Sequence, residues 1–421
     1  MKLSTKILMA FCVFGGILAI LLGLLLIDDE LSPETEAWIL KTQSELTSPS
    51  ESYYYFLGIM APKDKDPVTL GKKVHQKALS ANPQQNDQPY RISGKQLATY
   101  RPQDYCQVYK RSCFSLLLNS NLADEIIEKN SILIKRYETF INYPNYQQSH
   151  PAHDWSSYPN YTDLGFAHEV TLIKVLKSLA HNNKSGQNTL KKLESALKEK
   201  LAQSGTLLEK MFYLALFNQT LEFKNLAFSK NILKSPRLSD RLSKKELALT
   251  KAVRFDLLSH YYVNKDLMRN QNKLIMSLLL KPNMAANKLT RFLEYFKRFD
   301  HMTAEDKASY KFDYVEEYTL LESVRNYVGY TQSLIDLVPY KSYAIRLHDL
   351  DAKIAVLNWR LQQPHDADIN EEYLEQHDTA RLNPYKIGSF FIKKEESGKQ
   401  KLLCVPLEQH RDPRNVRCVQ L

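Results

Sequence analysis

The longest uncharged stretch of the chain lies close to its N-terminus. Residues Ile7 to Ile27 form 21 consecutive positions without a charged side chain. A helix rises about 1.5 Å per residue, so this segment is long enough to cross a hydrocarbon core of about 30 Å. Lys2 and Lys6 precede it, and three acidic residues follow it. This bias of basic residues predicts a cytoplasmic N-terminus (1–6), a transmembrane helix (7–27) and an exported body.

The end of the apolar run predicts that the span is an uncleaved signal anchor. A signal peptide has an apolar region of about 7 to 15 residues and small residues before its cleavage site, whereas this run ends in "LLLIDDE". Cys12 lies inside the run without the small residue that precedes a lipidated cysteine. No later apolar stretch approaches the roughly 20 residues of a second span, so we expect a single-pass protein.

Export places four cysteines in an oxidising compartment, where thiols tend to pair. Of the three possible connectivities, we favour the local pairs Cys106–Cys113 and Cys404–Cys418 over the crossed alternatives. A continuous helix would hold Cys106 and Cys113 about 10.5 Å apart along its axis. A disulfide requires Cα atoms about 4.4 to 6.8 Å apart, so the first pair predicts a turn. The spacings match neither a zinc ribbon nor a C-x-x-C redox motif.

Composition excludes several functional classes. The part after Ile27 has 55 basic and 47 acidic residues, a net charge of +8, and the two signs alternate along sequences such as "LKKLESALKEKL". This pattern is typical of solvated helix faces rather than of a nucleic-acid groove. There are 12 glycines and no G-x-G-x-x-G, Walker or G-x-S-x-G motif, so we expect no cofactor. The 25 tyrosines suit core packing and protein interfaces.

Hydrophobic periodicity predicts a mainly α fold. Glu34 to Leu46 reads as a short amphipathic helix, within a juxtamembrane and irregular segment that covers 28–120. In that segment "YYYFLGIM" could be a strand or the start of a helix docked on the body. A large helical domain follows at 121–363. We expect its helices at 122–143, 164–180, 189–202, 207–228, 244–263, 267–280, 285–299, 304–338 with one break, and 340–361.

The C-terminal tail has a different pattern. Residues 364–421 contain two short apolar runs separated by "ESGK", which predicts a β-hairpin appendage on the helical body. The sequence "VRCVQL" could add a third strand and bring Cys418 beside Cys404.

Several of these segments together resemble a known group of proteins. The anchor, "YYYFLGIMAPKDKDP", "ILIKRYETFINYP", "LDAKIAVLNWRLQ" and the closing "NPY" hairpin look like uncharacterised single-pass envelope proteins of Gram-negative bacteria. The resemblance covers short islands of the chain. It implies a bacterial origin, an anchor in the inner membrane and a periplasmic body, and it supplies no catalytic residues.

One loop could carry metal chemistry. The sequence "HPAHDW" contains His150, His153 and Asp154, and imidazole and carboxylate ligands suit zinc. A third ligand from the next helix, His168 or Glu169, would have to fold back on this loop. We favour ordinary loop packing and expect no bound metal, which leaves a metal-dependent periplasmic hydrolase as the alternative function.

These observations favour a binding protein. We expect a non-enzymatic, membrane-anchored periplasmic protein that contacts another protein in envelope assembly, secretion or protection against a toxin. Its partners would be the membrane and a protein, not nucleic acid, and its oligomeric state is left open.

Overall fold

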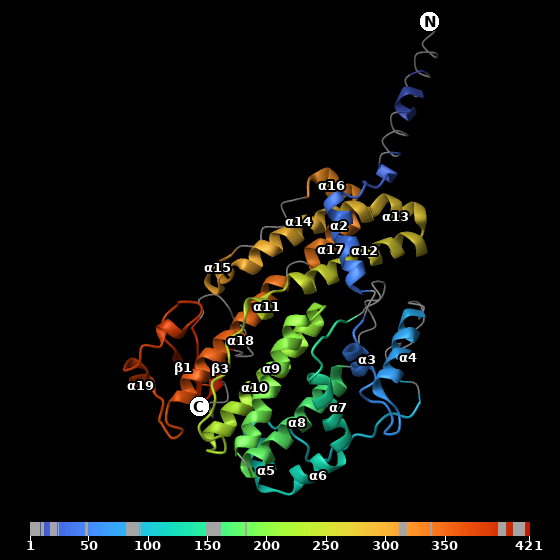
Figure 1. Ribbon diagram of the computed structural model, residues 1–421. Helices are drawn as coiled ribbons and strands as arrows, with labels where there is room; N and C mark the ends of the chain where they lie inside the picture. Colours follow the sequence, from blue (N-terminus) through green and yellow to red (C-terminus); the bar gives the residue numbers. More distant parts are fainter. Residues whose placement is uncertain are drawn as a thin grey trace.

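The computed structural model is mainly helical, with a small antiparallel sheet near the C-terminus, so the predicted fold class is confirmed at this level (Figure 1). It describes residues 9, 12–16, 23, 25–46, 49–80, 92, 94–148, 161–181, 183–310, 318–336, 339–394, 401–406 and 417–421. In these ranges no helix is long and apolar enough to cross a membrane. Most of the predicted span at 7–27 lies outside the described residues, and it stays a prediction.

The segment predicted to be juxtamembrane and irregular, 28–120, contains the expected helix near 34–46 and three further helices, whereas its described residues between 92 and 105 are irregular as predicted. It forms α2 (Pro33–Leu46), α3 (Glu51–Leu57), α4 (Pro67–Ser80) and α5 (Arg111–Asn119), and "YYYFL" belongs to α3. The helices α3 and α4 cross so closely that a Cβ atom on Gly71 would lie 1.7 Å from the Tyr54 carbonyl oxygen. Arg136 of the body donates to the carbonyl oxygens of Ile59 and Pro62 in the turn between these helices (3.0 and 2.9 Å). Short helices of this kind depend on tertiary contacts, which the local sequence does not display.

The predicted helix at 122–143 is wrong in its continuity. The structure divides it into α6 (Leu122–Lys129) and α7 (Ser131–Ile141), with Asn130 between them. The Asn130 side chain accepts from the Tyr100 backbone N–H and donates to the Tyr100 carbonyl oxygen, both at 3.0 Å. These two hydrogen bonds tie Asn130 to backbone that is distant in the sequence, and they favour a break at Asn130 over a continuous helix. The helices α8 (Tyr161–His181) and α10 (Leu207–Ser229) lie close to the predicted bounds, whereas α9 (Asn183–Gln203) begins well before the predicted 189.

The C-terminal half of the body adds eight helices within its described residues: α11 (Lys244–Leu247), α12 (Thr250–Asn270), α13 (Lys273–Leu279), α14 (Pro282–His301), α15 (Ala304–Ser309), α16 (Leu320–Arg325), α17 (Tyr327–Asp336) and α18 (Pro339–Gln362). The predicted boundaries near 244–280 are wrong. One break falls before Thr250, where Asp300 of α14 accepts from the Leu249 and Thr250 N–H groups (2.9 and 2.7 Å). The carboxylate of one helix therefore caps the start of another.

The C-terminal sheet is part of the main core and not an appendage. After α19 (Glu371–Glu375) and the 3₁₀ turn Ala380–Leu382, strands β1 (Phe391–Lys394), β2 (Lys401–Cys404) and β3 (Cys418–Gln420) form an antiparallel sheet in the order β1-β2-β3. Leu403 and Val419 are fully buried in the same apolar cluster as α10 and α18. Burial of this face explains why the tail stays attached to the helices.

Candidate functional site

The residues that follow the predicted membrane span are bound tightly to the body. The Asp28 carboxylate accepts hydrogen bonds from the backbone N–H groups of Asn283 (2.9 Å) and Met284 (3.3 Å), in the first turn of α14. An anion in this position is favoured by the unpaired N–H groups and the positive end of the helix dipole. Asp29 forms an ion pair with Arg325 at 3.2 Å. In the sequence these acids indicate only the orientation of the predicted span, because their partners lie more than 250 residues away.

A second row of contacts continues this attachment. The Asn287 side chain accepts from the Ser32 N–H (2.9 Å) and donates to the Glu30 carbonyl oxygen (2.8 Å). The Thr290 hydroxyl then contacts the Thr35 hydroxyl at 2.6 Å and accepts from the Trp38 indole at 2.5 Å. We call residues 28–32 the collar. Both rows of hydrogen bonds join this part of the chain to α14. The collar is therefore held in one position on the surface of the body.

An open groove lies beside the collar, between the start of α2 and the exposed side of α14. Its volume is ≈ 600 Å³. Its lining includes Ser32, Glu34, Arg291, Glu294, Tyr295 and Arg298. The groove therefore presents guanidinium, carboxylate and phenol groups, above a floor that the Thr290 hydrogen bonds hold in place. This chemistry suits an extended polar segment of another protein.

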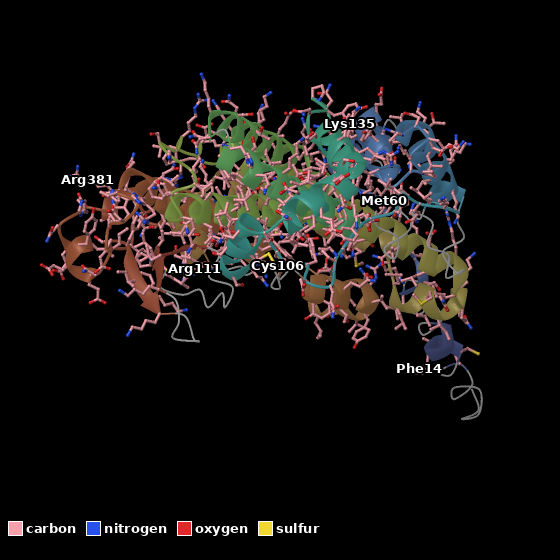
Figure 2. The ribbon with its side chains drawn as sticks, turned by 90° about the horizontal axis from the view of Figure 1, so that it is seen from below. Phe14, Met60, Cys106, Arg111, Lys135 and Arg381 are labelled. Atoms are coloured by element: carbon pink, nitrogen blue, oxygen red, sulfur yellow. A yellow bond between two sulfur atoms is a disulfide. The ribbon has the colours of Figure 1, made fainter. Side chains whose placement is uncertain are left out.

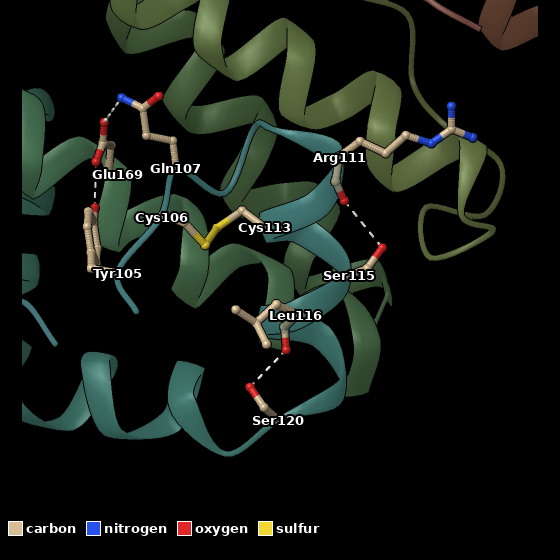
Figure 3. The surroundings of a disulfide bond; sticks show 9 residues. All are labelled: Tyr105, Cys106, Gln107, Arg111, Cys113, Ser115, Leu116, Ser120 and Glu169. Atoms are coloured by element: carbon tan, nitrogen blue, oxygen red, sulfur yellow. Dashed lines mark hydrogen bonds between the residues drawn. A yellow bond between two sulfur atoms is a disulfide. The ribbon is translucent and has the colours of Figure 1, made fainter. Parts of the chain in front are cut away.

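Both predicted local disulfides are present. Cys106 and Cys113 have Cα atoms 5.6 Å apart, and the chain turns between them as expected (Figure 3). Cys404 and Cys418 face each other across neighbouring strands, with Cα atoms 4.2 Å apart. The fifth cysteine, Cys12, is free and exposed.

The Cys106–Cys113 loop is held against α8 by a glutamate. The Tyr105 hydroxyl donates to Glu169 at 2.5 Å, and the Gln107 amide donates to the other carboxylate oxygen at 3.4 Å (Figure 3). Burial, together with the nearby Glu169 charge, raises the pKa of Tyr105, so its phenol stays protonated as a donor. The loop therefore has a structural role, and both carboxylate oxygens of Glu169 are occupied by its hydrogen bonds. We call this disulfide-closed loop and its bonds to Glu169 the disulfide clamp.

The described part of the chain does not support the alternative metal site. His150, His153 and Asp154 lie outside it. His168, the other proposed third ligand, is fully buried between the Tyr137 hydroxyl (2.9 Å) and the Thr220 hydroxyl (3.3 Å). Burial lowers the pKa of His168 to about 3, so the imidazole is neutral in the core. Within the ranges given above, no three His, Cys, Asp or Glu side chains gather as a metal site.

A buried carboxyl group was missed by sequence reasoning. Glu209 of α10 is fully buried and accepts from the Gly205 N–H at 2.7 Å. With its amide nitrogen turned inward, Gln148 donates to both Glu209 oxygens at 3.1 and 3.2 Å. Burial raises the pKa of Glu209 to about 7, into the range of a general acid or base. The flanking Tyr146 and Tyr213 are buried as well, so a substrate has no direct access to this carboxyl.

A serine and lysine also meet in the core. Lys224 donates to Ser239 at 2.8 Å and to Glu194 at 2.8 Å, and Ser239 donates to the other Glu194 oxygen at 2.8 Å. In a serine–lysine pair the serine hydroxyl gives its proton to the amine, whereas here the Ser239 hydroxyl donates to Glu194. All three side chains are buried, so this triad joins helices α9 and α10 to the following loop.

Comparison of the chain with family models, curated proteins and solved structures finds no match. Function is therefore inferred from the residues of this chain alone. Among the groupings described above, the groove is open to solvent, whereas the Glu209 and Glu194 clusters are buried. The groove is the better candidate for contact with another molecule.

Proposed function

We propose that this protein is a non-enzymatic, membrane-anchored periplasmic protein that binds another protein in envelope assembly, secretion or protection against a toxin. The main observation that supports this proposal is the groove between α2 and α14. Its lining offers charges of both signs and a half-buried tyrosine, Tyr295, a combination common in protein interfaces. Its walls are held by the collar and by Thr290, and a preorganised site loses little entropy on binding.

The location is supported by two independent features. The uncharged segment from Ile7 to Ile27 is long enough to span, and the basic residues before it favour an N-terminus in the cytoplasm. Two disulfides in one chain suit an oxidising compartment such as the periplasm. Together they support our proposal of a body on the periplasmic side of the inner membrane, tethered by a single helix.

The ionisable clusters support binding rather than catalysis. A catalytic group must reach the substrate, and the side chains of Glu209 and Ser239 are buried away from solvent. The exposed groove holds arginines and glutamates without a nucleophile paired to a base, an arrangement that favours recognition of a polar surface.

Site-specific photocrosslinking in intact cells tests the groove. A photoreactive phenylalanine analogue replaces Arg298 in the groove, and in a matched variant it replaces Lys192, an exposed residue on α9. We expect a discrete covalent adduct from position 298 that is absent from position 192 and weakened by Arg291→Glu. No adduct at 298, or the same adducts at both positions, would contradict the proposal. A reporter fused after Leu421 checks the location, since it should be active only if exported.

A further inference from the structure

Two short apolar helices of the body bury none of their side chains. These are α13, with the sequence "KLIMSLL", and α16, with the sequence "LLESVR". Leu274 is 64% exposed and Leu320 is 82% exposed. We call the large exposed apolar residues of this region the anchor-side patch: Leu274, Ile275, Leu279, Leu320, Leu321, Val324 and Tyr327. Isolated exposed leucines are ordinary, but a cluster of this kind marks an interaction surface.

The patch lies beside the point at which the N-terminal segment meets the body. Helices α13 and α16 pack against each other, and the Asn326 side chain accepts from the Lys281 N–H at 2.9 Å, at the start of α14. Arg325, next to Val324, donates to the Ile27 carbonyl oxygen at 3.1 Å. Figure 1 shows α13 and α16 at the same end of the molecule as the start of α2, and Figure 2, seen from below, shows Phe14 outside the body.

We propose that the anchor-side patch lies in the interfacial layer of the lipid bilayer from which the anchor emerges. The inference rests on the proposed membrane anchor. Ile27 is the last residue of the uncharged segment and is 61% exposed, so a spanning segment brings the bilayer surface to Ile27. The apolar side chains around Ile27 then meet lipid before they can meet any other partner.

The composition of the patch matches that environment. Tyr327 is exposed, and tyrosine is enriched at membrane–water interfaces because its ring is apolar and its hydroxyl polar. Lys273, at the start of α13, is an exposed cation that suits anionic lipid headgroups, and the exposed Arg269 nearby has one nitrogen 3.8 Å from the Asp266 carboxylate. Apolar side chains with cations nearby are characteristic of segments that lie on a bilayer.

Contact with lipid would fix the orientation of the body. The collar already binds the chain after Ile27 to α14. Contact between the patch and lipid adds a second attachment of the body to the membrane. A body held at two places cannot turn freely about a flexible tether. The groove, which begins at Ser32, is then presented to partners at a constant height just above the membrane.

Depth-dependent fluorescence quenching tests this contact on the full-length protein. In a Cys12→Ser background, Leu321→Cys is labelled with an environment-sensitive fluorophore, and Leu116→Cys, a leucine of α5 that is 44% exposed, serves as the matched control. Each is reconstituted in phosphatidylcholine–phosphatidylglycerol liposomes with and without brominated acyl chains. We expect several-fold stronger quenching and a blue-shifted emission at 321, and neither at 116. In a further variant, Leu274→Asp with Leu320→Asp should reduce the quenching at 321 severalfold without changing liposome flotation.

The outcomes separate this inference from the proposed anchor. A protein that floats with the liposomes but shows no lipid quenching at 321 has an anchor and refutes the lipid contact. A blue shift at 321 that depends on the protein-to-lipid ratio and resists brominated lipid shows that a second copy covers the patch, which also refutes it. Failure to float overturns the anchor itself, and the lipid contact with it.

Discussion

Replacement of Glu209 by glutamine should change how the stability of the protein depends on pH. The wild-type carboxyl is fully buried, and burial raises its pKa from the ordinary value of 4.5 to about 7. Glutamine has the same shape, keeps an oxygen for the Gly205 N–H, and carries no charge at any pH. The variant therefore isolates the free-energy cost of ionising this one group.

The direction in which stability changes with pH follows from the raised pKa of Glu209. The folded protein holds the Glu209 proton more tightly than the unfolded chain, so the stabilising contribution is complete below about pH 4.5 and is lost as the pH rises to about 7. A shift from 4.5 to about 7 corresponds to about 3 kcal/mol, at roughly 1.4 kcal/mol per pKa unit. The two bonds from Gln148 favour the ionised form, so about 3 kcal/mol is an upper limit.

Urea unfolding followed by tryptophan fluorescence, from pH 4.5 to 8.5 in a mild detergent, measures this effect. The free energy of unfolding of Glu209→Gln, minus that of the wild type, should rise by up to about 3 kcal/mol across the range and level off above pH 7. Buried histidines such as His168 contribute equally to both proteins and cancel. Glu128→Gln at an exposed site controls for the loss of one negative charge. A flat difference curve would refute the reasoning and show that water reaches Glu209.

Three further predictions test the disulfide clamp, the buried triad and the metal alternative. Cys113→Ser should destabilise the protein by about 2 to 3 kcal/mol by chain entropy for a loop of this length, without unfolding it, and peptide mapping without reductant should recover the Cys404–Cys418 link in that variant. Glu194→Ala should cost about 3 to 5 kcal/mol in urea unfolding, because it leaves the Lys224 charge buried without its partner. An equally stable Glu194→Ala variant would show that water solvates the amine. Alanine at both His150 and His153 should leave metal content by mass spectrometry unchanged and alter stability by at most about 1 to 2 kcal/mol. Loss of stoichiometric zinc would favour the hydrolase.

Much of the helical body could be predicted because its signals are local. A 3.6-residue apolar stripe shows which face of a helix will be buried, and it located α8, α10, α14 and α18 to within a few residues, whereas α9 begins at Asn183 and not at the predicted 189. Buried positions such as Leu133 and Ile134 follow that stripe. The hairpin and both disulfides were also accessible to sequence reasoning, because closing a short loop costs little entropy.

The site itself depends on contacts between distant parts of the chain. Nothing near Asp28 in the sequence shows that it caps α14, and nothing near Glu209 shows that Gln148 will meet its carboxylate. The same is true of the breaks at Asn130 and before Thr250, where the deciding hydrogen bonds come from other elements.

The sequence by itself determined the helical class and the uncharged N-terminal segment, and it favoured the local cysteine pairs, because these features depend on residues close together in the chain. The structure then showed which cysteines pair. Only the tertiary structure decided that the collar is rigid, that a groove runs beside it and that the apolar side chains of α13 and α16 remain uncovered. Hydrophobic pattern tells which residues would gain from burial, but the packing of the whole chain decides which of them obtain it.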